Sequence, residues 1–209
     1  TFSRSVYDDI IPGPTSIAIN STSWGPCLPG ALASCTVSGA TLTSTGGTFV
    51  QKVLNYGTGL GVSGGVSGSE IDIGQSLRVA FPAPHAVTKI EVLFLFNGPE
   101  FGDKAEVAKV TTDQGWYTLT MPTDVNNGVA VWRDSSGAAI SGAVTQCSAN
   151  ATTNATSTGP GCFRITNPFP SPVLSMTFEA LPGNNATNGS TNTNDSDYSI
   201  GSIEAYEGV

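Results

Sequence analysis

The fold class is decided by two neighbouring stretches, Glu70-Ile-Asp-Ile-Gly-Gln-Ser-Leu-Arg-Val-Ala-Phe81 and Ile90-Glu-Val-Leu-Phe-Leu-Phe96. In the second half of the first stretch, apolar side chains share one face of an extended chain and polar ones the other, which is typical of a half-buried strand. The second stretch becomes apolar on both faces, which predicts a central strand in a stack of two sheets. Between them, we expect His85 to lie in a solvent-exposed turn with its flanking prolines.

The remainder of the chain repeats this pattern of short strands and turns. Residues 1–26 contain two early prolines and then an alternating segment, so they predict an extended arm that pairs with its own sheet or a neighbour's. Residues 184–195 are polar, and the strand pattern resumes after them, so they are interpreted as a long loop. We therefore expect one all-β domain over residues 1–209, a two-sheet β-sandwich or jelly roll with long polar loops. Its other strands are expected at residues 16–20, 36–43, 48–54, 107–111, 116–121, 129–133, 163–166, 174–180 and 198–206.

Charge and hydropathy exclude two classes of partner. Lys and Arg total 8 against 16 Asp and Glu, for a net charge of −8. Nucleic acids and anionic membrane surfaces both require clustered basic side chains, so neither is expected as a partner. No apolar run reaches the roughly 18 residues that a membrane span needs. The chain begins without Met or an apolar leader, as a processed exported protein would.

The four cysteines form two local pairs, Cys27 with Cys35 and Cys147 with Cys162. Local loops cost the least entropy to close, so these pairs are the expected disulfides. Zinc is the alternative, but seven and fourteen intervening residues lack the short C-x₂₋₄-C spacing of most structural zinc sites. Disulfides imply an oxidising compartment, which predicts a secreted or extracellular, cell-surface protein.

Asn-x-Ser/Thr sites are frequent, and each is either a glycosylation site or an unmodified polar loop. The six sites are Asn20, Asn150, Asn154, Asn185, Asn188 and Asn194.

Two catalytic motifs occur without the structural context that each needs. Residues 59–64 match the dinucleotide-binding pattern G-x-G-x-x-G, and residues 61–65 match the nucleophile elbow G-x-S-x-G. Both motifs require a helix directly after the glycines, and the next residues are again glycine-rich. We interpret this segment as a glycine-rich loop or strand edge.

Acidic side chains offer two kinds of site. Glu70 and Asp72 are expected on one face of a strand, and Glu100, Asp103 and Glu106 follow the central strand. Two such carboxylates on either side of a cleft would suit a glycoside hydrolase.

Calcium is the one possible cofactor, because it prefers hard oxygen ligands from acidic loops. The expected ligands are Glu100 and Asp103, or Asp195 and Asp197; the alternative is that these loops are solvated and metal-free.

The tryptophans Trp24, Trp116 and Trp132 suit either stacking on sugar rings or core packing.

Several segments together resemble exported bacterial surface proteins of the PEP-CTERM, or choice-of-anchor, kind. The likeness covers about residues 56–110 and 163–206, and its motifs are at residues 59–65, 70–74, 95–103, 167–169 and 196–200. The resemblance implies a secreted β-sandwich that associates with the cell surface or exopolysaccharide, generally without a catalytic residue. This chain departs from that family in its two disulfide loops, in its Asn/Thr-rich insertions and in its end, which has no sorting motif.

The function expected from these features is a non-enzymatic extracellular structural protein, a building block of a surface matrix, surface layer or filament. The filament would assemble by self-association, with the N-terminal arm completing a neighbour's sheet. The alternative is a calcium-assisted carbohydrate-binding module that takes a polysaccharide, and a glycoside hydrolase is the third hypothesis.

Overall fold

The computed structural model describes residues 15–28, 32–55, 57–96, 105–121, 129–147, 161–183 and 196–207. Within these ranges the regular secondary structure is all strand apart from one short 3₁₀ turn, η1 (Gly25–Cys27), so the all-β prediction is confirmed. The strands are β1 (Ser16–Asn20), β2 (Ser34–Val37), β3 (Ala40–Thr45), β4 (Phe49–Leu54), β5 (Gly57–Val62), β6 (Ser76–Leu93), β7 (Val107–Thr112), β8 (Gly115–Thr120), β9 (Val131–Asp134), β10 (Val144–Gln146), β11 (Cys162–Thr166), β12 (Val173–Leu181) and β13 (Ser199–Glu207).

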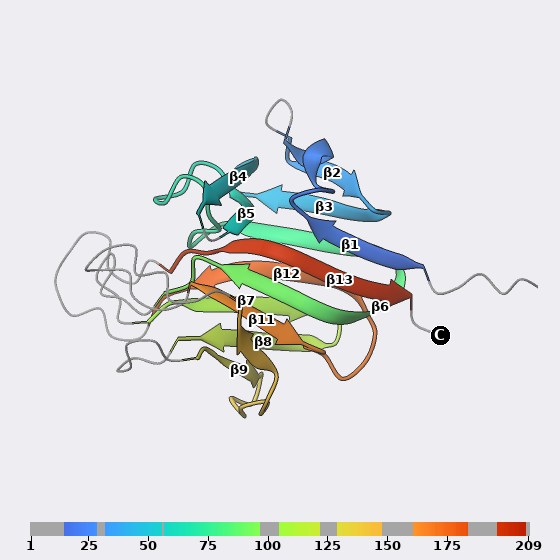
Figure 1. Cartoon of the computed structure of the whole chain (residues 1–209), viewed down its shortest axis with the longest axis vertical. Coiled ribbons are helices and arrows are strands. Elements are labelled where there is room, and N and C mark those ends of the chain that lie inside the picture. Colours follow the sequence, from blue (N-terminus) through green and yellow to red (C-terminus); the bar gives the residue numbers. More distant parts are fainter. Residues whose placement is uncertain are drawn as a thin grey trace, which may run out of the picture.

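All of these strands join one open sheet that is organised around β6 (Figure 1). The first part of β6 pairs with β3 and β12, and β12 continues through β7 and β8 to β9. The last part of β6 pairs instead with β13 and β11. One buried cluster contains side chains from strands in both halves of the sheet, from β1 to β13. The apolar faces of the two halves therefore pack against each other. This arrangement has the layers of a β-sandwich.

Strand β6 corrects the prediction of two separate strands with an exposed turn between them. Its eighteen residues run continuously through Pro82 and Pro84, and the ladder to β12 shifts register at this point. Proline is tolerated where ladder hydrogen bonds are interrupted, as they are at this crossing between the two halves. His85 is consequently buried, with 1% of its surface exposed; its ring stacks on Phe81 with centroids 5.0 Å apart.

The end of the predicted central strand is covered on both sides, as expected. Leu93 and the next three residues, 94–96, are all buried. Part of this segment forms a second small apolar cluster with Cys162. Both predicted disulfides are present, Cys27–Cys35 joining η1 to β2 and Cys147–Cys162 joining the end of β10 to β11.

The N-terminal arm is described from residue 15 onward. Its strand β1 runs antiparallel to β13 from Ser16↔Tyr206 to Asn20↔Ser202, and the two strands lie side by side in Figure 1. Ile17 and Ile19 point into the main core, which explains the alternation seen in the sequence.

Candidate functional site

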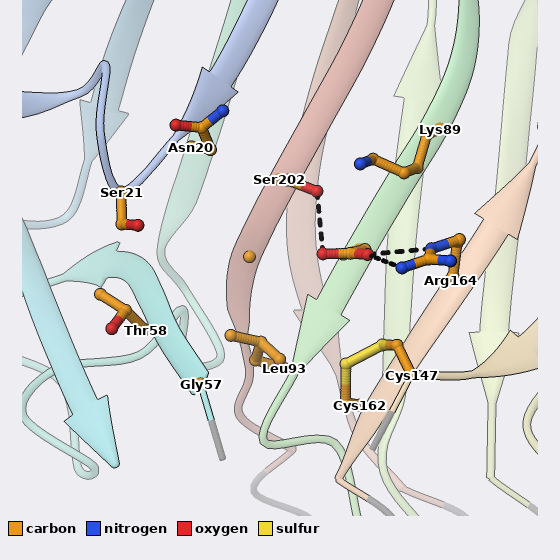
Figure 2. A pocket seen from close by; sticks show the side chains of 12 residues that line it. Asn20, Ser21, Gly57, Thr58, Lys89, Leu93, Cys147, Cys162, Arg164 and Ser202 are labelled. Carbon is orange, nitrogen blue, oxygen red and sulfur yellow. Dashed lines mark hydrogen bonds and ion pairs between the residues drawn. A yellow bond between two sulfur atoms is a disulfide. The ribbon is translucent and has the colours of Figure 1, made fainter. Parts of the chain in front are cut away.

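A polar groove of about 430 Å³ lies on the face of β6, β11 and β13 that points away from the core (Figure 2). Its far rim comes from the end of β1 and the start of β5, and the Cys147–Cys162 disulfide closes one end. Leu93 forms part of the wall beside Gly57 and Gly201; a Cβ on either glycine would come within about 3.0 Å of the Leu93 side chain. The absence of side chains at these two positions therefore keeps the groove open.

Three cross-strand neighbours form the centre of the groove. Register places Glu91 of β6 opposite Arg164 of β11 on one side and Ser202 of β13 on the other. The Arg164 Nε and Nη2 atoms donate to Glu91 Oε1 at 2.9 and 2.6 Å, and Ser202 Oγ donates to Glu91 Oε2 at 2.9 Å. Next to them, Lys89 Nζ bonds Glu204 Oε1 at 2.6 Å. The groove thus presents paired charges and hydroxyls, which suits a polar, uncharged ligand such as a sugar.

Asn20 lies at the rim of this groove. Its Oδ1 accepts hydrogen bonds from the backbone nitrogen of Thr22 at 2.9 Å and from Thr22 Oγ1 at 2.6 Å. The sequence motif thus forms a local Asx turn. The other five predicted glycosylation sites, Asn150, Asn154, Asn185, Asn188 and Asn194, lie outside the described residues.

The three tryptophans have different environments. Trp24 and Trp132 are buried; the Trp24 indole donates to Gln51 at 2.8 Å and the Trp132 indole to the Pro168 carbonyl at 3.1 Å. Sugar stacking at these two positions is therefore wrong, because no ring face is open to a ligand. Trp116 on β8 is 40% exposed, and Lys109 Nζ lies 5.4 Å from its ring centroid.

Four acidic side chains gather away from the groove, at the end of the sheet where β5, β7 and β13 begin or end. Glu70, Asp72, Glu106 and Asp197 are all buried. Glu70 forms an ion pair with Lys52 of β4, and Glu106 accepts a hydrogen bond from the backbone of Phe96. The strand expected at Glu70 and Asp72 is reduced in the described residues to one isolated bridge, Ile71↔Tyr198, and the two carboxylates on either side of Ile71 are buried.

Burial changes the protonation of this acidic cluster. Desolvation, followed by the hydrogen bond with Glu70 and by the nearby charge of Glu106, raises the pKa of Asp197 to about 12. Desolvation also raises the pKa of Asp72, against the hydrogen bonds that it accepts from the backbone and hydroxyl of Ser67 at 3.1 and 2.8 Å. Asp197 is therefore a neutral acid at neutral pH.

Of the four expected calcium ligands, only Asp197 is among the described residues. Glu100, Asp103 and Asp195 lie outside the described residues, and Asp197 is buried instead of solvated. Within the described residues, no three His, Cys, Asp or Glu side chains converge as a metal site would require. The prediction of calcium at these four residues is therefore still untested.

The glycine-rich motifs have a packing explanation. Residues 59–62 lie in strand β5, and no helix follows within the described chain. A Cβ on Gly59 would overlap the side chain of Ser199, and one on Gly61 would overlap the backbone of Ser69. The glycines allow the close approach of neighbouring segments, and neither the phosphate loop nor the elbow is formed.

Sequence reasoning missed Lys52, Glu91 and Arg164. Each lies alone in a strand pattern, and the partner of each is 18 or 73 residues away in the chain. The low number of basic residues could have identified them. With only 8 Lys and Arg in the chain, one that lies within a strand is expected to have a specific acidic partner.

None of the protein-family models, curated proteins or solved structures compared with this chain matches it significantly. In the described residues, no helix has the length and hydrophobicity to cross a membrane. The two disulfides are compatible with an extracellular protein.

Proposed function

We propose that this chain is a non-enzymatic structural subunit of an extracellular assembly, a filament, surface layer or cell-surface matrix whose copies are joined by their N-terminal strands. The observation that carries the proposal is the position of β1. It is the first described strand, it lies at an edge, and its ladder runs to β13 alone among the described strands. Because β13 is its partner strand in the described residues, the same strand can pair with β13 of another copy without any other change.

The buried side chains of β1 support exchange between copies. Ile17 and Ile19 fill the core from this edge. A copy whose β1 pairs with a second copy therefore needs the β1 of another copy to complete its own core. That requirement would drive head-to-tail growth, since an unfilled edge exposes apolar surface.

Paired cysteines distinguish exchange from self-pairing. Ala18 lies opposite Glu204, and both side chains are accessible, so Ala18→Cys with Glu204→Cys places two thiols across the ladder. We expect a ladder of covalent multimers on a non-reducing gel, and the Ala18→Cys single variant gives dimers at most. A monomeric, internally bridged double variant would refute strand exchange. Deletion of residues 1–20, which removes β1, should prevent the formation of polymers, as judged by electron microscopy.

A carbohydrate-binding function is the second candidate, because Trp116 on β8 keeps an exposed ring beside Lys109. The test is calorimetry with a panel of glycans, with and without a calcium chelator. We expect Trp116→Ala to weaken binding at least tenfold and the matched variant Trp116→Phe to retain most of it. Failure of the unmodified protein to bind any glycan would eliminate this candidate.

A further inference from the structure

Lys52 reaches across its neighbouring strand to a buried carboxylate. It lies opposite Gly59 in the β4–β5 ladder, and the missing side chain of Gly59 leaves room above Phe94. The Lys52 Nζ atom sits 4.9 Å from the Phe94 ring centroid and is ion-paired with Glu70. The Lys52 side chain is 30% exposed and that of Glu70 only 2%.

A second acid, Asp197, is a neighbour of Glu70. The Asp197 side chain is hydrogen-bonded to Glu70 and is held just before β13, in a residue that is 5% exposed. Its Oδ2 atom has no hydrogen-bond partner in the described part of the chain. An amine, a carboxylate and a neutral carboxylic acid are therefore neighbours, and both acids are buried.

We propose that Lys52 and Glu70 condense to an amide, forming an intrachain crosslink between β4 and the segment that precedes β6. Nζ of Lys52 first passes a proton to the Glu70 carboxylate oxygen that it contacts and then attacks Cδ of Glu70; the new Nζ–Cδ bond replaces the bond from Cδ to that protonated oxygen. Asp197 gives its proton to the departing oxygen, which leaves as water, and recovers a proton from the nitrogen. The net change is ammonium plus carboxylate to amide plus one water, so no oxidant or other reactant is needed.

Three features of the site favour this reaction. The reacting groups are already in contact, which replaces an encounter between two molecules with a step inside one. Burial of the charged Glu70 carboxylate carries a desolvation penalty, and conversion to a neutral amide removes that penalty. Exclusion of water favours loss of water and slows the reverse hydrolysis. The product would tie the β4–β5 hairpin to the body of the sandwich, independently of whether the chain polymerises.

Mass spectrometry tests the crosslink on the full chain, produced in a host that does not glycosylate it. We expect the reduced protein to be lighter than its sequence by one water. Trypsin should fail to cleave after Lys52, so that residues 5–78, which end at the next basic residue, remain one peptide. Fragmentation of that peptide should yield no breaks that separate residue 52 from residue 70.

Two variants serve as controls. Lys52→Arg retains the charge and lacks a primary amine, so it should have its full mass while still forming both disulfides. Asp197→Asn retains the size but cannot supply the proton, and it should slow the water loss at least tenfold. The proposal is overturned if the unmodified chain has its full mass and is cleaved after Lys52. A link from Lys52 to Asp197, seen as two joined peptides, overturns it as well.

Discussion

The groove and the acidic cluster are built from the same residue types in opposite surroundings. In the groove, Glu91 is paired with Arg164, and the two side chains are 19% and 46% exposed. In the cluster, Glu70 is paired with Lys52 and is buried near the carboxyl groups of Asp72, Glu106 and Asp197. Water screens the first pair more than the second, so the energetics differ although the chemistry is alike. The comparison shows that depth in the sandwich, and not residue type, decides what an acid–base pair can do.

The largest expected effect is the pH dependence of stability. The folded pKa of Asp197, about 12, lies above its ordinary value of 3.8, so between these values the folded chain holds a proton that the unfolded chain releases. The free energy of unfolding should therefore fall as pH rises from 5 to 8, by up to about 1.4 kcal/mol per pH unit. Asp72, whose pKa is also raised, contributes in the same direction.

Urea unfolding at a series of pH values measures this slope, with Asp197→Asn as the control. The variant has no proton to release, so its slope should be shallower than that of the unmodified chain. A parallel pair of curves would show that Asp197 is ionised in the folded state and that the cluster behaves like the groove.

The next effect is the loss of the buried cation. Lys52→Met keeps the length of the side chain and leaves Glu70 buried without its partner. Removing one member of a buried pair costs roughly 3 to 5 kcal/mol, and we expect about 3 here because Lys52 is 30% exposed. The free energy of unfolding in urea measures it against Lys52→Arg, which keeps the charge of the ion pair and cannot form the amide. A loss under 1 kcal/mol would place this pair with surface ion pairs.

The smallest effect is expected in the groove. Arg164→Met removes the matching cation from Glu91, and an exposed pair contributes less than about 1 kcal/mol. The difference from the unmodified chain should also shrink in high salt, which screens surface charges. A loss as large as that of Lys52→Met would remove the distinction between the two regions.

The strand pattern and the cysteine pairing were readable in the sequence because both are local. Alternation over a few residues predicted the strands around Leu77 and Ile90, and short spacing predicted the disulfides. His85 was misplaced because two prolines normally mark a turn, whereas here they lie at the crossing of one long strand between two halves of the sheet. Trp24 and Trp132 offered no local signal that separates core from surface.

By itself, then, the sequence determined an all-β sandwich with two local disulfides, since strand periodicity and loop closure depend on residues close together in the chain. Only the tertiary structure decided which charged groups meet. Lys52, Glu70 and Asp197 come together because β4, the segment before β6 and the start of β13 converge at one end of the sheet. Burial there makes Asp197 a neutral acid, and desolvation is a property of the folded surroundings that no residue carries in its own sequence position.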